Sequence, residues 1–136
     1  MATGLYDKGR ENFGKKKFDW PNDDVRVVFG DSADYTVNLA TDDALDDVTS
    51  GGRVGVSAAS IANKTNTLGV MDADDHTINT VSGDQFECVI LYLHTGTEST
   101  SLLIAYIDNY TGLPCTPNGG NITVSWPNDS NKIFKL

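Results

Sequence analysis

Residues 85–108 constrain the fold more than any other stretch of this sequence. Two runs rich in aliphatic, aromatic and β-branched residues are separated by a short segment of Thr, Gly, Glu and Ser, a pattern that predicts a β-hairpin. In the first run Cys88, Ile90 and Tyr92 alternate with Val89, Leu91 and Leu93; in the second, Leu103, Ala105 and Ile107 alternate with Leu102, Ile104 and Tyr106. Both faces of the hairpin are therefore apolar. One cover is expected from the domain's own core, and the other from another element or another subunit.

The length and the ends of the sequence predict a single soluble domain. A chain of 136 residues buries roughly two-thirds of its unfolded surface and folds without disulfide staples. Cys88 and Cys115 are expected to be reduced, with Cys88 acting as a small buried hydrophobe. Neither a signal-peptide pattern nor a run of about 18 apolar residues is present. Synthesis in a bacterial cytoplasm and no membrane partner are the expectations.

The charge of the chain is acidic and unevenly distributed. A formal net charge of −9 argues against nucleic acid as a partner, because binding to a phosphate backbone depends on clustered Lys and Arg. Residues 1–20 nevertheless carry a net charge of +2, which leaves −11 on the remainder. This basic N-terminal arm is either a docking device or a solvated first helix and turn.

The spacing of Leu5, Tyr6, Gly9 and Phe13 predicts a short helix over residues 4–14 with one apolar stripe. Such a helix is too short to be stable alone, so it must lie on an apolar surface, and the second face of the hairpin is a candidate. The predicted organisation is an N-terminal arm with a short helix, residues 1–20, followed by a β-sandwich domain, residues 21–136.

The rest of the chain predicts an all-β domain. The expected strands are Val25–Phe29, Arg53–Ile61, Asn66–Met71, Thr77–Val81, the two strands of the hairpin, Asn121–Trp126 and Lys132–Phe134. About eight short strands with turns every 8–15 residues indicate a single-domain sandwich or a jelly-roll-like barrel.

The acidic residues are the first candidates for metal binding. Asp72, Asp74 and His76 have the spacing of the first ligands of an EF-hand, but Thr77 and Gly83 stand where that loop needs Gly and Glu. Asp42, Asp43, Asp46 and Asp47 are candidates for an irregular calcium site, with a solvated acidic loop as the alternative. The two histidines, His76 and His94, lack the spacing of a zinc site. We therefore expect no obligate metal and no cofactor.

The sequence lacks catalytic motifs but contains aromatic residues that could bind sugar. The sequence contains no nucleophile elbow, phosphate loop or dinucleotide-binding fingerprint, so we expect no enzymatic function. Tyr35, Tyr110 and Trp20 lie in or beside predicted loops, where aromatic rings with Asp and Asn neighbours can bind carbohydrate. A carbohydrate-binding module is therefore an alternative.

Six segments of the chain, in the same order, resemble a family of small virion structural proteins of tailed bacteriophages and prophages. They are Gly4–Phe13, Val25–Leu39, Ser82–Gln85, Thr95–Asp108, Gly112–Gly120 and Asn131–Leu136. The likeness spans nearly the whole chain and is weakest over residues 49–81. It implies a structural role in the particle and carries over no ligand or catalytic residue.

The resemblance makes a capsid decoration or cement protein on the outside of the head the expected function, with a tail or fibre component as the runner-up. The expected partners are the major capsid protein and further copies of this chain, and the expected location is the capsid surface. The candidate partner-binding residues are Leu5, Tyr6, Phe13, Lys15, Lys16, Lys17, Phe18 and Tyr92. In this hypothesis apolar residues bury area against the shell while the lysines pair with its acidic groups.

Overall fold

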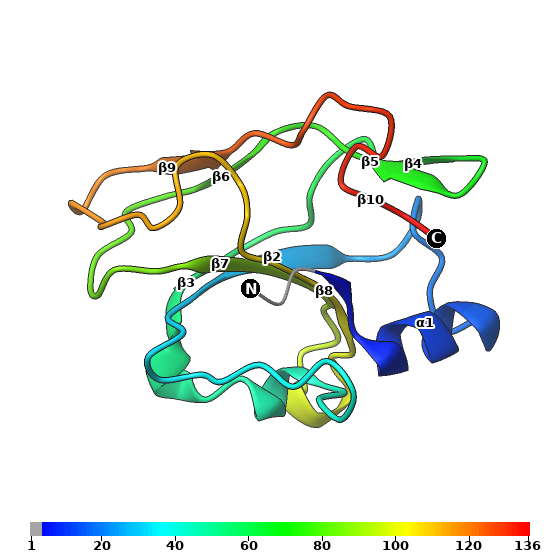
Figure 1. Cartoon of the computed structure of the whole chain (residues 1–136), viewed down its shortest axis with the longest axis horizontal. Coiled ribbons are helices and arrows are strands. Elements are labelled where there is room, and N and C mark those ends of the chain that lie inside the picture. The colour runs from blue at the N-terminus through cyan, green and yellow to red at the C-terminus, as the bar shows by residue number, and fades with distance from the viewer. Residues whose placement is uncertain (1–3) are drawn as a thin grey trace.

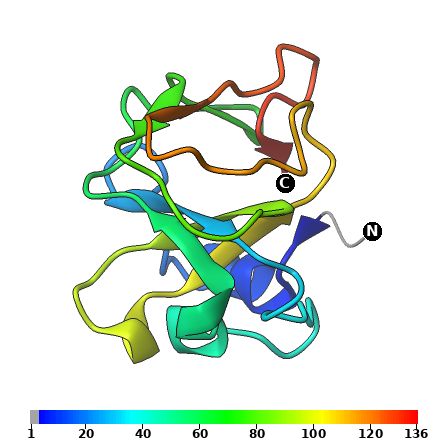
Figure 2. The ribbon, with the colours of Figure 1, turned by 90° about the vertical axis from the view of Figure 1, so that its left-hand side faces the viewer.

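A computed structural model describes residues 4–136 and has three layers (Figure 1). A five-stranded antiparallel sheet forms the middle layer. Two smaller sheets cover one face of it, and the only α-helix of the described residues lies beside irregular loops on the other face (Figures 1 and 2). The predicted mostly-β fold with one short N-terminal helix is confirmed. Of the two predicted architectures, the structure has the sandwich, because none of the described sheets closes into a barrel.

The middle sheet contains the predicted hairpin at its centre. Its strands are β1 (Gly4–Leu5), β2 (Val25–Gly30), β3 (Arg53–Val56), β7 (Cys88–Leu93) and β8 (Leu103–Ile107), in the order β1-β8-β7-β2-β3. Strands far apart in the sequence are paired in this sheet. Gly4 of β1 is opposite Tyr106 of β8, and Val25 of β2 is opposite Leu93 of β7. The short helix η3 (Glu98–Thr100) lies in the loop of the hairpin.

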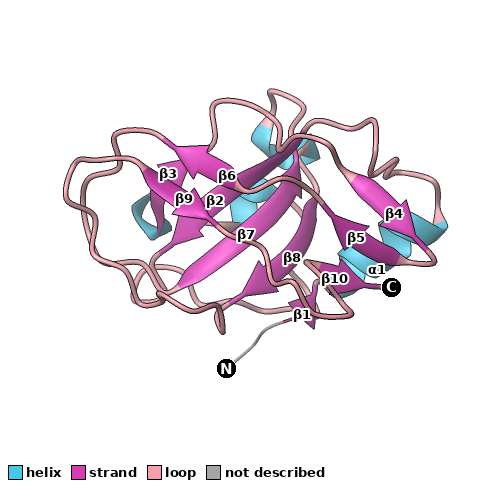
Figure 3. Cartoon of the chain, turned by 90° about the horizontal axis from the view of Figure 1, so that it is seen from above, coloured by secondary structure: helices cyan, strands magenta, loops and turns pink. Residues whose placement is uncertain are grey.

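The upper layer consists of short strands. β10 (Phe134–Lys135), β5 (Val70–Asp72) and β4 (Thr65–Thr67) form one sheet, and β6 (His76–Ile78) pairs with β9 (Ile122–Val124) in the other, as the view from above shows (Figure 3). The predicted single strand Asn66–Met71 is wrong. Leu68 and Gly69 have φ angles of +53° and +85°, so the chain reverses there and makes a β4–β5 hairpin.

The first hydrophobic core lies between the middle sheet and the upper layer. From the middle sheet it receives Val27, Phe29, Val89 and Leu91, and from the upper layer Met71, Ile78, Val124 and Trp126. The rings of Phe29 and Phe86 stack with centroids 4.3 Å apart. In β5, β6 and β9 one residue of each strand is buried in this core, whereas the outer strand β4 is exposed along its length.

The second hydrophobic core covers the other face of the hairpin, and this chain supplies all of it. It contains Tyr6, Tyr35, Leu45, Val48, Cys88, Ile90, Tyr92, Leu103 and Tyr106. The covering elements are α1 (Asp7–Gly14), the loop from residue 31 to 44, and the short helices η1 (Leu45–Asp47) and η2 (Ser50–Gly52). A second subunit is therefore not needed to bury this face. The homo-oligomer stays a prediction, but no uncovered face of the hairpin requires it.

A β-bulge corrects the predicted alternation of the second hairpin run. Leu91 is paired with Ala105, whereas Tyr92 is paired with Leu103, so Ile104 is an extra residue on β8. As a result Leu103 lies in the second core with Tyr92, not on the face of Ala105. Prediction from strict alternation fails here because a bulge shifts the register by one residue.

The N-terminal segment is integrated with the sheet. β1 extends the sheet beyond β8, the N–H of Tyr6 donates to the carbonyl of Ile104 at 3.1 Å, and α1 packs on β8. The predicted helix over residues 4–14 is thus a two-residue strand followed by a helix. The predicted division at residue 20 is not a break in packing, because residues 4–20 contribute to both cores. Within residues 4–136 no helix is long and apolar enough to cross a bilayer.

Candidate functional site

The structure divides the predicted partner-binding residues into two groups. Leu5, Tyr6, Phe18 and Tyr92 are buried, whereas Phe13 is half-buried and Lys15, Lys16 and Lys17 are exposed. The buried members are part of the protein's own cores and present no surface to a partner in this structure. The structure therefore brings together only the lysine turn, residues 15–17, as an exposed candidate contact.

Aromatic rings fix the position of this lysine turn. The ring centroids of Phe13 and Phe18, on either side of the turn, are 4.8 Å apart in an edge-to-face contact. Phe13 also contacts Phe134 of β10 at 6.1 Å, and Trp20 contacts the same ring at 5.4 Å. Edge-to-face geometry is favourable for aromatic pairs, so the turn is held between α1 and the upper layer.

The basic charge of the N-terminal segment is partly neutralised within the segment itself. Lys8 and Lys15 pair with Glu11 at 3.1 and 2.8 Å, and Arg10 pairs with Asp7 at 2.8 Å. The hydrogen bonds from Lys15 and then Lys8 lower the pKa of Glu11. Within residues 4–136, Lys16 and Lys17 make no ion pair. Two lysines at one turn thus remain available to an acidic partner.

Tyr92 is the clearest correction among the predicted contact residues. Its side chain is 1% exposed and lies in the second core, under the loops that follow β2. Burial raises the pKa of its hydroxyl. Tyr92 was predicted to lie at a subunit interface if its face of the hairpin were uncovered, and the loop between residues 31 and 48 covers that face instead.

A buried chain of hydroxyl groups joins the N-terminal segment to this loop. The Tyr6 and Tyr35 hydroxyls are 2.9 Å apart, and the Tyr35 hydroxyl donates to Asp42 Oδ2 at 2.6 Å. The same Asp42 oxygen accepts the N–H of Asn38 at 2.9 Å. Burial raises the pKa of both tyrosines, so both hydroxyls stay protonated and available as donors. Asp42 therefore has a structural role at the edge of the second core.

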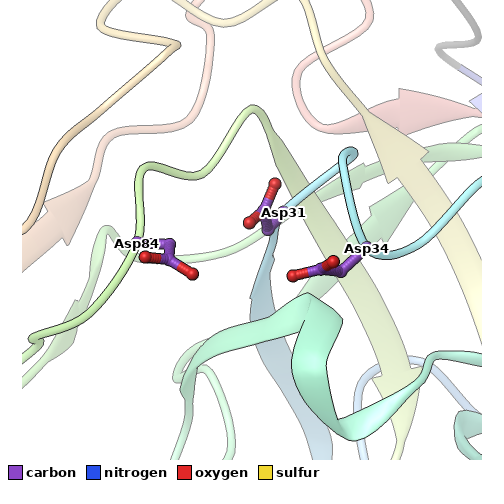
Figure 4. A group of neighbouring side chains, drawn as sticks. All are labelled: Asp31, Asp34 and Asp84. Atoms are coloured by element: carbon purple, nitrogen blue, oxygen red, sulfur yellow. The ribbon is translucent and has the colours of Figure 1, made fainter.

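Two groups of three carboxylates occur among residues 4–136. In each group the ligand atoms lie within 4.8 Å of one another. The first group is Asp31, Asp34 and Asp84, where the Asp34 and Asp84 side chains point toward each other beside Asp31 (Figure 4). Asp31 is buried, and its Oδ1 accepts the N–H of Ala33 at 2.9 Å, which is a local turn. The other two carboxylates are exposed.

The second group contains three of the four aspartates singled out in the sequence, namely Asp43, Asp46 and Asp47. Asp47 Oδ2 accepts the N–H groups of Asp43 and Ala44 at 2.7 and 3.4 Å, as in a helix N-terminus. Burial and the neighbouring Asp47 raise the pKa of Asp43. Asp42 is separate, since it binds Tyr35. All three carboxylates are exposed, and exposed acidic groups are common without an ion.

A serine–histidine contact joins the upper layer to the middle sheet, and the sequence pattern did not indicate it. Ser57 Oγ and His76 Nε2 are 2.7 Å apart, and Ser57 Oγ also accepts the N–H of Val27 at 3.1 Å. Ser57 is only 4% exposed, so a substrate does not reach this hydroxyl in the folded protein. Burial lowers the pKa of His76. The pair fixes β6 of the upper layer to the middle sheet, and spacing alone does not reveal it because 19 residues separate the two side chains.

A half-open groove of about 580 Å³ lies between the upper layer and the loop after β8. Its lining includes the apolar side chains of Phe86, Val89 and Leu113 and the polar side chains of Asn109 and Asp129. Tyr110 also lines the groove. Its hydroxyl is buried and lacks a hydrogen-bond partner, and burial raises its pKa.

The aromatic residues of the carbohydrate-binding alternative do not form a platform. Trp20 and Tyr35 are 2% and 3% exposed and belong to different cores. Only Tyr110 is near a groove. Stacking on a sugar needs an accessible ring face, so the structure removes two of the three rings on which that alternative depended.

Comparison of the sequence with protein-family models and with curated proteins finds no match in either.

Proposed function

We propose that this chain is a structural protein of a tailed-phage virion that decorates the outside of the head, with the major capsid protein and further copies of itself as partners. The observation that carries the proposal is the resemblance of six segments, in the same order, to small virion proteins. In the fold these segments are not scattered. They contain β1, α1, β2, η3, β8 and β10, which include three strands of the middle sheet and the helix that covers it.

The surface supports a binding role for the lysine turn. Lys16 and Lys17 are exposed and make no ion pair within the described residues, while the chain as a whole is acidic. Two unpaired lysines beside a half-buried aromatic cluster match an acidic patch on a shell. A single exposed ion pair contributes at most about 1 kcal/mol, but many copies on a lattice act together.

The test is binding to particle heads assembled without this protein, measured by co-sedimentation at low and high salt. The double variant Lys16→Glu, Lys17→Glu is expected to bind roughly tenfold more weakly at low salt, since two rim ion pairs become repulsions. The matched control Lys16→Arg, Lys17→Arg keeps the charge and is expected to bind as the unchanged protein does. Both positions are exposed, so both variants are expected to fold.

Deletion of residues 1–18 is a poor test of the contact, because it removes Leu5, Tyr6 and Phe18 from the cores. If the unchanged protein binds purified tails and not heads, the decoration role is wrong and the tail component replaces it. If it binds neither, the virion proposal fails. If the glutamate variant binds heads as well as the arginine control does, the lysine turn is not part of the contact.

A further inference from the structure

The tip of the β4–β5 hairpin carries a leucine where folding favours a polar residue. Leu68 and Gly69 are the two loop residues between the paired Thr67 and Val70, and both have positive φ. Turns of this kind favour Asn-Gly or Asp-Gly, because a residue with a β-carbon is strained at positive φ and Asn or Asp tolerates it best. A leucine here therefore destabilises the turn relative to asparagine.

Packing does not explain the leucine either. Leu68 is 93% exposed, against 52% for Leu136 and 43% for Val56, the other exposed large hydrophobic residues among residues 4–136. Its side chain thus gains almost nothing from either core. Isolated exposed leucines are ordinary on protein surfaces, but this one combines nearly full exposure with an unfavourable backbone conformation.

The neighbours of Leu68 add a second apolar side chain and a positive charge. The N–H of Leu136 donates to the carbonyl of Gly69 at 2.9 Å, which holds the half-exposed Leu136 beside the hairpin tip. Lys135 is paired with Val70 and is exposed. No ion pair involves Lys135 in the described part of the chain.

The lysine turn lies at the same end of the molecule. Phe134, which precedes Lys135, contacts the ring of Phe13, and Phe13 contacts Phe18 directly after the turn. Figures 1 and 3 place α1 and the β4–β5 hairpin at one end in both views. We call this surface the leucine-lysine end; it comprises Leu68, Leu136, Lys16, Lys17 and Lys135. The loop over residues 31–47 runs on the opposite side of the middle sheet from the β4–β5 hairpin (Figure 1).

We propose that Leu68 is the central apolar anchor of a protein contact, inserting into an apolar pocket on an acidic surface while Lys16, Lys17 and Lys135 pair with carboxylates around it. The inference rests on the proposed function and identifies the part of the molecule that meets the outer surface of the head. Protein contacts commonly have this arrangement, with a desolvated anchor at the centre and charged residues at the rim.

The small apolar area of this end favours a protein over a membrane as the partner. One almost fully exposed leucine beside a half-exposed one buries little area in a bilayer, where stable binding depends on a large apolar face. A pocket on a protein desolvates a single side chain more completely. The strained turn then has a functional explanation, because it presents Leu68 at the tip of a short hairpin.

The test uses the variant Leu68→Asn, for which stability and binding are expected to change in opposite directions. Asparagine suits the turn, so the melting temperature should rise, whereas binding to heads assembled without the protein should weaken by about tenfold or more through loss of the anchor. Val56→Thr, which alters an exposed hydrophobic residue on the edge strand β3, is the matched control and should bind unchanged. A merely structural role for Leu68 would change stability and leave binding unaffected.

Four results would overturn the inference, and they are distinguishable. If the unchanged protein binds heads and Leu68→Asn binds equally well, the anchor is wrong while the proposed function stands. If the unchanged protein does not bind heads, the proposed function fails and the inference with it. Binding to vesicles of equal parts phosphatidylglycerol and phosphatidylcholine that Leu68→Asn abolishes would make the partner a membrane. If Leu68→Asn loses oligomers in sedimentation but still binds heads, the partner of Leu68 is a second copy of the chain.

Discussion

Gly9 of α1 offers a sharp test of how the N-terminal segment is packed. A β-carbon at this position would lie 2.9 Å from the carbonyl oxygen of Ile104 and 3.1 Å from that of Leu103. Both atoms belong to the backbone of β8, a strand paired on both sides, so neither moves easily. The glycine thus lets α1 approach the sheet closely enough to cover its second face.

Two effects of Gly9→Ala oppose each other. Alanine favours the helix by about 1 kcal/mol over glycine. Forcing an extra methyl group into a packed contact costs typically about 1–3 kcal/mol, and the upper half of that range applies because the obstruction is backbone. The net expectation is a destabilisation of about 1–2 kcal/mol, which lowers the melting temperature by about 4–8 °C in a domain of this size.

Gly14→Ala is the matched control, since nothing lies within 4 Å of a β-carbon at Gly14. Here only the helix propensity acts, and a stabilisation of about 0.5–1 kcal/mol is expected. Urea unfolding followed by circular dichroism measures both variants. If Gly9→Ala is as stable as Gly14→Ala, α1 is not seated on β8, and the segment is free to act as the arm that the sequence suggested.

Two further predictions concern the cores. Tyr92→Asp places an unpaired charge in the second core and is expected to unfold the chain rather than release a folded monomer. Circular dichroism and size-exclusion chromatography distinguish these results, and a folded monomeric variant would mean that this face is a subunit interface. Burial lowers the pKa of His76, so as the pH falls the imidazole is protonated in the unfolded chain before it is protonated in the folded protein. The stability contributed by neutral His76 is therefore complete above about pH 6.5 and is lost as the pH falls through the lower folded pKa. Urea unfolding at pH 7.5 and 5.5 should show a smaller loss of unfolding free energy for His76→Gln than for the unchanged protein, and equal losses would exclude the effect.

The central hairpin and the α1 segment could be predicted from the sequence because their signals are local. A double-sided apolar run is visible without knowing what covers it, and the helical spacing from Leu5 to Phe13 indicated a helix here, although Leu5 and Tyr6 precede α1 and lie in different cores. What covers the second face could not be predicted. Leu45 and Val48 lie within an acidic, loop-like stretch, and only the tertiary fold places them over β7.

Two details of register were also beyond the sequence. The bulge that moves Leu103 to the second core has no residue signature in β8, since every residue there is apolar. The β4–β5 hairpin was hidden because its turn is Leu-Gly rather than Asn-Gly, so the segment reads as one strand. In the candidate contact, the exposed lysines were predicted as a group. That Leu5 and Tyr6 are buried while Lys15, Lys16 and Lys17 are exposed depends on packing, which periodicity does not specify.

The pairing of β1 with β8 has a consequence for how the chain is made. Gly4 and Leu5 find their partners only when Tyr106 and Ala105 have emerged from the ribosome, about one hundred residues later. At a synthesis rate of about 5–20 residues per second, that interval is roughly 5–20 s. Tyr6, which is fully buried in the finished fold, stays exposed on the nascent chain for this time. The segment that completes the second core is thus translated well before the strand it pairs with, and it docks late.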